Sequence, residues 1–100
     1  MTRLTAEHRR AQIVDAARKL SYEGGLYDWT LRDVAEHIGT SRSTVRHYFP
    51  SVLSLRTEII TGAIRERDVP IVVQALAKVD PLVADIKPAL RRACAEHMAA

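Results

Sequence analysis

A short run in the first half of the chain is rich in side chains that can hydrogen-bond to phosphates and to base edges. No aspartate or glutamate occurs from His37 to Thr57, whereas Arg42, Arg46 and Arg56 lie inside this stretch. A helix without carboxylates suits the phosphate-lined major groove of DNA, because phosphate would repel a carboxylate there. The residues expected to face DNA from this helix are Ser41, Arg42, Ser43, Thr44, Arg46, His47 and Tyr48.

The surrounding residues predict two short helices joined by a tight turn, over about 30–37 and 41–48. Thr30 and Asp33 have the spacing of a capping box, with aspartate in the position usually held by glutamate. Gly39 follows the last apolar position of the first helix, where a left-handed residue commonly ends a helix. Because the turn is so short, the two helices must cross steeply, which is the helix-turn-helix arrangement.

The second helix of this pair is expected to begin at the N-cap Ser41 and to stop at Pro50. Its only apolar anchors are Val45 and Phe49, so its other side chains remain exposed. Its two arginines are four residues apart and therefore point to roughly the same side. The amides at its N-terminus are placed where a phosphate could dock.

An amphipathic helix is expected before this pair. It opens at Thr5, a good N-cap, and ends before Gly24-Gly25, a strong stop signal. It would complete a three-helix head over residues 1–50, which we predict to be the DNA-binding domain. Its inward face is formed by Ile13, Ala16, Ala17 and Leu20.

Residues 51–100 are predicted to form a linking helix and the start, or a short form, of a helical regulatory and dimerisation region. The linking helix runs to about Arg67, Asp80-Pro81 opens a further helical segment, and Pro88 predicts a kink or restart. Alternation typical of strands is nearly absent. The predicted fold is all-α: a three-helix head, a longer linking helix and one or two further helices.

The segments RAQIVDAARKL (10–20), EGG (23–25), TLRDVAEHIG (30–39) and SRSTVRHYFPS (41–51) together resemble the N-terminal domain of the TetR family of transcriptional regulators. The resemblance covers roughly residues 9–60. It implies a three-helix DNA-binding head joined to a longer helix. It also implies a homodimer that binds an inverted-repeat operator in double-stranded DNA and acts as a repressor until a small molecule releases it.

The same resemblance implies roles for single residues. Thr30 and Arg32 fall where the family contacts the DNA backbone or neighbouring base edges, and residues 41–48 fall on the recognition helix. Arg46 stands where the family usually has tyrosine, and Val52 where it commonly has a lysine that contacts phosphate. Thr40 replaces a usually apolar turn residue. Family members are considerably longer, so a small-molecule effector is expected only if further residues follow the C-terminus.

Composition is compatible with one modest core: 47% of the 100 residues are hydrophobic, and the net charge is only +3. The single cysteine, Cys94, excludes an internal disulfide and suits a reducing compartment. The chain offers no signal peptide and no membrane span, which predicts a soluble, cytoplasmic protein. Its four histidines have no metal-ligand spacing, and no cofactor motif is present.

The sequence also bears on two other classes of function. An enzyme is not expected, because the pair Asp33 and His37 has no third partner and no nucleophile motif occurs. The stronger alternative is a helical protein-interaction module whose helix-turn-helix no longer binds DNA. The apolar stripe that supports it, which could pair with another chain as readily as fold back, is formed by Leu82, Ile86, Leu90 and Cys94.

Overall fold

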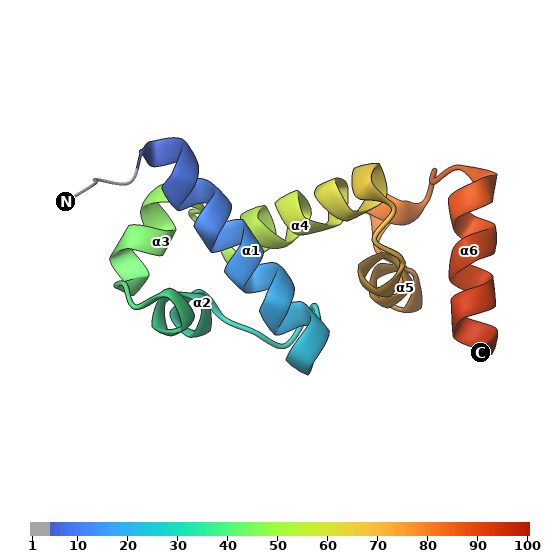
Figure 1. Cartoon of the computed structure of the whole chain (residues 1–100), viewed down its shortest axis with the longest axis horizontal. Helices are drawn as coiled ribbons and strands as arrows, with labels where there is room; N and C mark the ends of the chain where they lie inside the picture. Colours follow the sequence, from blue (N-terminus) through green and yellow to red (C-terminus); the bar gives the residue numbers. More distant parts are fainter. Residues whose placement is uncertain (1–4) are drawn as a thin grey trace. The chain divides into compact units, whose positions relative to one another are not determined.

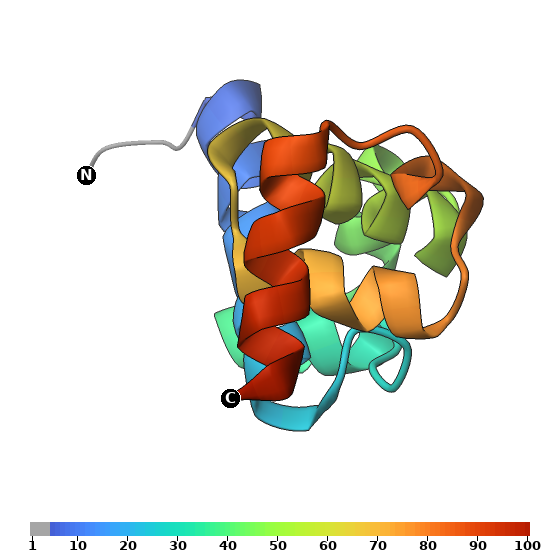
Figure 2. The same ribbon diagram turned by 90° about the vertical axis from the view of Figure 1, so that its right-hand side faces the viewer.

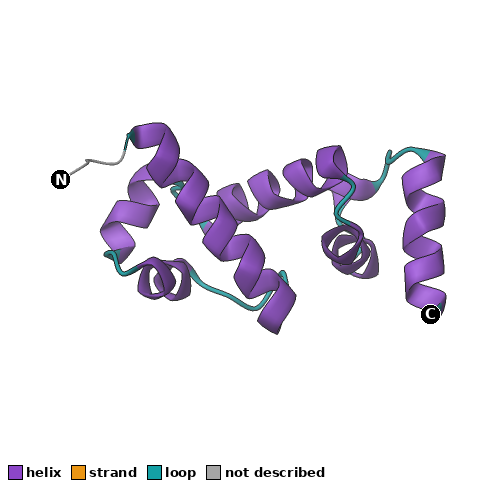
Figure 3. Cartoon of the chain, viewed as in Figure 1, coloured by secondary structure: helices purple, strands orange, loops and turns teal. Residues whose placement is uncertain are grey.

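The computed structural model describes residues 5–100, and every regular element in that range is a helix (Figures 1 and 3). The all-α prediction is therefore confirmed. The chain divides into two compact units, Met1–Arg56 and Thr57–Ala100. Among residues 5–100, no helix combines the length and apolar character needed to cross a membrane. The elements are α1 (Ala6–Gly24), α2 (Leu31–Ile38), α3 (Arg42–Tyr48), α4 (Val52–Glu66), α5 (Val69–Ala77), the 3₁₀ turn η1 (Pro81–Val83) and α6 (Pro88–Ala99).

Helix α1 begins where the sequence predicts. The Thr5 hydroxyl accepts a hydrogen bond from the backbone N–H of His8 at 3.1 Å, which is an N-cap. Its predicted end is wrong by one residue, because Gly24 belongs to the last turn. Gly25 ends the helix with φ +115°, a conformation open to glycine, and donates its N–H to the carbonyl of Ser21 at 3.1 Å.

Helix α2 is closed at both ends by local hydrogen bonds. Thr30 Oγ1 accepts from the N–H of Asp33 at 3.1 Å, and the Asp33 carboxylate accepts from the N–H of Thr30 at 2.8 Å. These two bonds form the predicted capping box. Gly39 ends the helix in the left-handed region at φ +70°, as predicted.

The core of the first unit lies where α1, α2 and α3 meet. Helix α2 packs against both α1 and α3. The predicted inward face of α1 is largely confirmed: Ile13, Ala16 and Ala17 are buried, and Leu20 is half-buried. Other core residues, all without exposed surface, are Leu26, Val34, Val45 and Leu55.

In the second unit, α5 packs against α6 (Figures 1 and 2). Pro88 begins α6 after the extended residue Lys87, so the predicted restart is confirmed. The segment opened by Asp80-Pro81 is only a single 3₁₀ turn, in which the Asp80 carboxylate accepts from the N–H of Leu82 at 3.0 Å.

The apolar stripe of the second unit is mostly turned inward. Ile86, Leu90 and Cys94 are 9%, 3% and 0% exposed, whereas Leu82 is 40% exposed. Within this chain the stripe therefore folds back, and its main part is not a surface for another protein. Burial of the Cys94 thiol raises its pKa, because the thiolate loses solvation, and the charge of Arg91 lowers it by less.

Candidate DNA interface

Helices α2 and α3 are joined by the tight turn that the sequence predicts (Figure 1). The N–H of Thr40 donates to the carbonyl of Ala35 at 2.9 Å, which closes the end of α2. Ser41 then begins α3, because its hydroxyl accepts from the N–H of Thr44 at 3.1 Å. Hydrogen bonds between residues close in the sequence thus position α2, the glycine turn and α3.

Helix α3 is attached to the first unit by one face only. Val45 has no exposed surface and Phe49 is 3% exposed, so the two predicted anchors are confirmed. Phe49 is extended before Pro50, which ends the helix. The guanidinium of Arg10, on α1, lies 4.7 Å from the centroid of the Phe49 ring. No sequence signal connects these two residues, which lie far apart in the chain.

The other side chains of α3 are accessible to different degrees. Arg42, Ser43, Arg46 and His47 are exposed, as is the N-cap Ser41. Thr44 and Tyr48 are half-buried. The hydroxyls of Ser41 and Thr44 lie 3.0 Å apart and hydrogen-bond to each other, and the rings of His47 and Tyr48 meet edge to face. Ser41 and Thr44 therefore have a structural role at the helix start.

A groove brings several of the predicted residues together. It has a volume of about 460 Å³ and lies between the start of α2, the exposed side of α3 and the start of α4. Thr30 and three arginines, Arg32, Arg42 and Arg46, line it, and no carboxylate does. The remaining lining residues are Leu31, Pro50, Ser51 and Val52. Ser43, Thr44, His47 and Tyr48 lie outside this groove.

Charge and helix ends give the groove a positive character. Arg32, Arg42 and Arg46 line the groove together with the first residues of α2 and α4, and the dipole at the start of a helix favours negative charge. Arg32 also pairs with Glu36 at 3.4 Å, but the two side chains are 78% and 69% exposed. An ion pair this exposed is weak, so it leaves the Arg32 guanidinium available to an anion.

The residues at the start of α4 were not among the predicted contacts. Ser51 accepts from the N–H of Ser54 at 3.1 Å and thereby caps α4, which places Val52 at the edge of the groove. The signal that could have indicated this edge was Ser51 directly after Pro50, a cap that follows a helix stop. Val52 is apolar, so this edge offers a backbone N-terminus but no side-chain charge.

Arg56 does not belong to this groove, although it lies in the same acid-free stretch. Its Nε donates to the carbonyl of Leu26 at 3.3 Å. Its guanidinium lies 4.7 Å from the ring centroid of Tyr27 and 5.9 Å from that of Trp29. Arg56 therefore holds the loop between α1 and α2. Of the three arginines in the acid-free stretch, only Arg42 and Arg46 line the groove.

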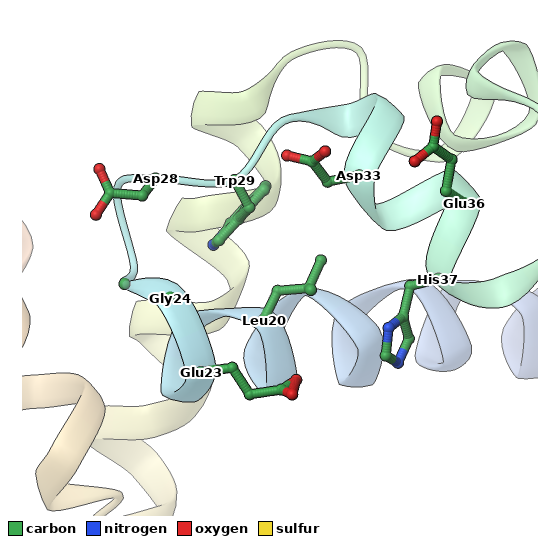
Figure 4. A pocket seen from close by; sticks show the side chains of 9 residues that line it. Leu20, Glu23, Gly24, Asp28, Trp29, Asp33, Glu36 and His37 are labelled. Carbon is green, nitrogen blue, oxygen red and sulfur yellow. The ribbon is translucent and has the colours of Figure 1, made fainter.

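A separate hollow beside α2 is acidic. A hollow of about 540 Å³ is lined by Glu23, Asp28, Asp33 and Glu36, which surround Leu20 and Trp29 (Figure 4). His37 also lines it, but Asp33 already accepts the capping hydrogen bond. In the described part of the chain, no three histidine, cysteine or acidic side chains are grouped to hold a metal ion. Phosphate would be repelled from this side of the head.

Two short helices that meet at a glycine turn, with the second held by one face and carrying arginines and hydroxyls on the other, define a helix-turn-helix protein. Residues 13–58 match the family model described as bacterial regulatory proteins, tetR family. Residues 13–58 therefore carry a helix-turn-helix domain of the TetR type, the domain of a family of bacterial DNA-binding transcriptional regulators. No curated protein and no solved structure gives a significant match to the chain.

Proposed function

We propose that this regulator is a sequence-specific repressor that binds an inverted-repeat operator as a homodimer, with α3 of each protomer in the major groove. The observation that supports this most directly is the groove that joins Arg32, Arg42 and Arg46 without any carboxylate. An interface for DNA needs cations for phosphates and donors for base edges, and arginine supplies both.

The residues at the interface divide by their expected partners. Arg46 is proposed to read a base, because guanidinium pairs bidentately with O6 and N7 of guanine. Thr30 and Arg32, beside the start of α2, are proposed to bind phosphate, as is Arg42. The other residues proposed to contact DNA are Ser41, Ser43, Thr44, His47 and Tyr48, all at the start of α3 or on it.

The proposal assigns the remaining chain to assembly and control. Residues 1–50 form the DNA-binding domain, and residues 51–100 form the linking helix and part of a region for dimerisation and regulation. A small-molecule effector is proposed only with further residues beyond the C-terminus. The protein is proposed to act in the cytoplasm, where bacterial DNA lies, as a regulator and not as an enzyme.

The test is selection from a random DNA duplex library, followed by fluorescence anisotropy on the enriched duplex at two salt concentrations. We expect an inverted repeat whose half-site centres lie about one helical turn, or a multiple of it, apart. Arg46→Ala should cost about 1–3 kcal/mol on this site and relax the preference at one base pair. Arg92→Ala, which removes an exposed arginine of α6, is the charge-matched control and should change little.

Each other outcome has a definite meaning. Equal losses on selected and random duplexes would make Arg46 a phosphate contact, and enrichment of single half-sites would place the dimer interface outside this chain. No enrichment by folded protein would reject sequence reading and favour the protein-interaction module. The main argument for that alternative was the apolar stripe after α5, and three of its four residues, Ile86, Leu90 and Cys94, are buried within the chain.

A further inference from the structure

The arginine-lined groove has two walls, formed by the first residues of α2 and the first residues of α4. The chain connects these walls through α3 and two short turns, and α2 packs closely against α1 and α3. We propose that Arg56 is a positioning residue for DNA binding, which ties α4 to the loop before α2 and so holds the two walls at the separation that DNA requires. This inference rests on the proposed function, because it concerns the same groove.

At one wall, Arg56 lies on the early part of α4, in the same compact unit as the groove. It follows Val52 by four residues, so the two side chains lie on the same side of the helix, one turn apart. Val52 lines the groove, whereas Arg56 is half-buried and does not. A contact made by Arg56 therefore holds the turn of α4 that forms this wall.

At the other wall, the loop that Arg56 contacts leads directly into α2. The Arg56 Nε donates to the carbonyl of Leu26 at 3.3 Å, and the guanidinium lies 4.7 Å from the ring centroid of Tyr27 and 5.9 Å from that of Trp29. Trp29 immediately precedes Thr30, which is both the N-cap of α2 and a groove residue. The contacts of Arg56 therefore connect the wall at α4 with the wall at α2.

The loop is attached independently to α1. The indole Nε1 of Trp29 donates to the Ser21 hydroxyl at 2.8 Å, and the N–H of Asp28 donates to the carbonyl of Gly25 at 3.3 Å. These bonds hold the loop to the end of α1, whereas Arg56 holds the same loop to α4. Without the guanidinium, the start of α2 would stay attached to α1 but would be held less firmly relative to the start of α4.

The contacts of Arg56 depend on the shape of a guanidinium and not only on its charge. A planar guanidinium stacks on aromatic rings while its fixed N–H groups donate to a carbonyl, and a lysine ammonium cannot reproduce this geometry. Leu26 has no exposed surface and Trp29 is 5% exposed, so the loop that receives these contacts is itself firmly packed. Lysine at this position should therefore keep the charge but lose the positioning.

The first test needs no DNA. The full chain, labelled with ¹⁵N, is compared with Arg56→Lys and Arg56→Met by NMR relaxation dispersion, and circular dichroism checks that each variant is folded. We expect both variants to show increased conformational exchange at the amides of residues 30–32 and 51–53. Arg65→Met, which removes an exposed arginine of the same helix, is the matched control and should leave these amides unchanged.

The second test measures affinity for the selected duplex and for random duplexes at two salt concentrations. Both Arg56 variants should bind the selected duplex about tenfold more weakly, the size of one lost base contact, with the salt dependence unchanged. If Arg56 instead contacts phosphate, lysine should keep the affinity and methionine should reduce the salt slope by about 1. Tyr27→Leu changes no charge, yet it should weaken the selected duplex like Arg56→Met and add little in that background.

The outcomes separate this inference from the proposed function. The positioning role is overturned if the amides of residues 30–32 and 51–53 behave as in the original chain, if Arg56→Lys binds the selected duplex as tightly as the original chain, or if Arg56→Met lowers the salt slope. If the original chain selects no duplex, the proposed function fails, and the amide measurements alone then decide whether Arg56 holds the two walls together.

Discussion

A buried hydrogen bond between Ser21 and Trp29 connects α1 to the loop before α2. The indole Nε1 donates to Ser21 Oγ at 2.8 Å, and this hydroxyl donates to the carbonyl of Ala17 at 2.8 Å. Ser21 is 1% exposed and Trp29 is 5% exposed, so water has little access to the bond. Ser21→Ala should lower the free energy of unfolding by about 1–3 kcal/mol, because a buried N–H donor loses its partner.

A double-mutant cycle separates this hydrogen bond from packing. Trp29→Phe removes the indole donor but also removes buried volume, so its own cost is a mixture of the two effects. Once the donor is absent, Ser21→Ala should cost little. We therefore expect a coupling energy of about 1 kcal/mol or more between the two substitutions. Ser43→Ala, on the exposed side of α3, is the control and should stay within about 0.5 kcal/mol.

Urea denaturation followed by circular dichroism measures all these variants on one scale. Trp29 is the only tryptophan, so its fluorescence reports the same transition in the variants that retain it. If Ser21→Ala costs as much in the Trp29→Phe background as in the original chain, the hydrogen bond does not provide the stability and the reasoning is refuted. A loss smaller than about 0.5 kcal/mol would refute it as well.

Three further predictions concern the ends of α1 and α2 and the core of the second unit. Thr30→Ala should cost about 1 kcal/mol because the capping box is lost, whereas Thr30→Ser should cost little; an unchanged denaturation midpoint would reject the capping role. Gly25→Ala should cost more than about 1 kcal/mol, because φ is +115° and the new Cβ would lie 2.5 Å from Asp28 Oδ2. Gly24→Ala, whose Cβ would meet nothing within 4 Å in a helix, should be neutral or stabilising, and equal effects of the two substitutions would contradict this. Burial raises the pKa of Cys94, so its contribution to stability is present below the ordinary thiol pKa and is lost as pH rises through the folded value. Denaturation between neutral and alkaline pH should therefore show a steeper decline for the original chain than for Cys94→Ala, and parallel profiles would disprove the assignment.

Local signals in the sequence were sufficient for the ends of most helices. The caps at Thr5, Thr30 and Ser41 were predicted correctly, because each depends on a bond to an amide three residues away. Gly39 and Pro88 were also predicted correctly, since their backbone preferences do not depend on distant residues. The one-residue error at Gly24 reflects a choice between two adjacent glycines, of which only Gly25 has a positive φ.

Contacts between distant residues had to come from the tertiary structure. Charge pattern alone grouped Arg56 with Arg42 and Arg46, but Arg56 stacks on Tyr27 and Trp29, about thirty positions away. The apolar stripe left open whether Ile86, Leu90 and Cys94 face another chain, and packing within the second unit buries them.

By itself, the sequence determined the all-α class, the helix-turn-helix and the acid-free exposed side of α3, because periodicity, caps and residue type act over a few neighbouring positions. Only the tertiary structure decided which arginines share a groove and which carboxylates line the separate hollow beside α2. The physical reason is the same in each case: these arrangements depend on how helices pack, and packing brings together side chains that no local pattern relates.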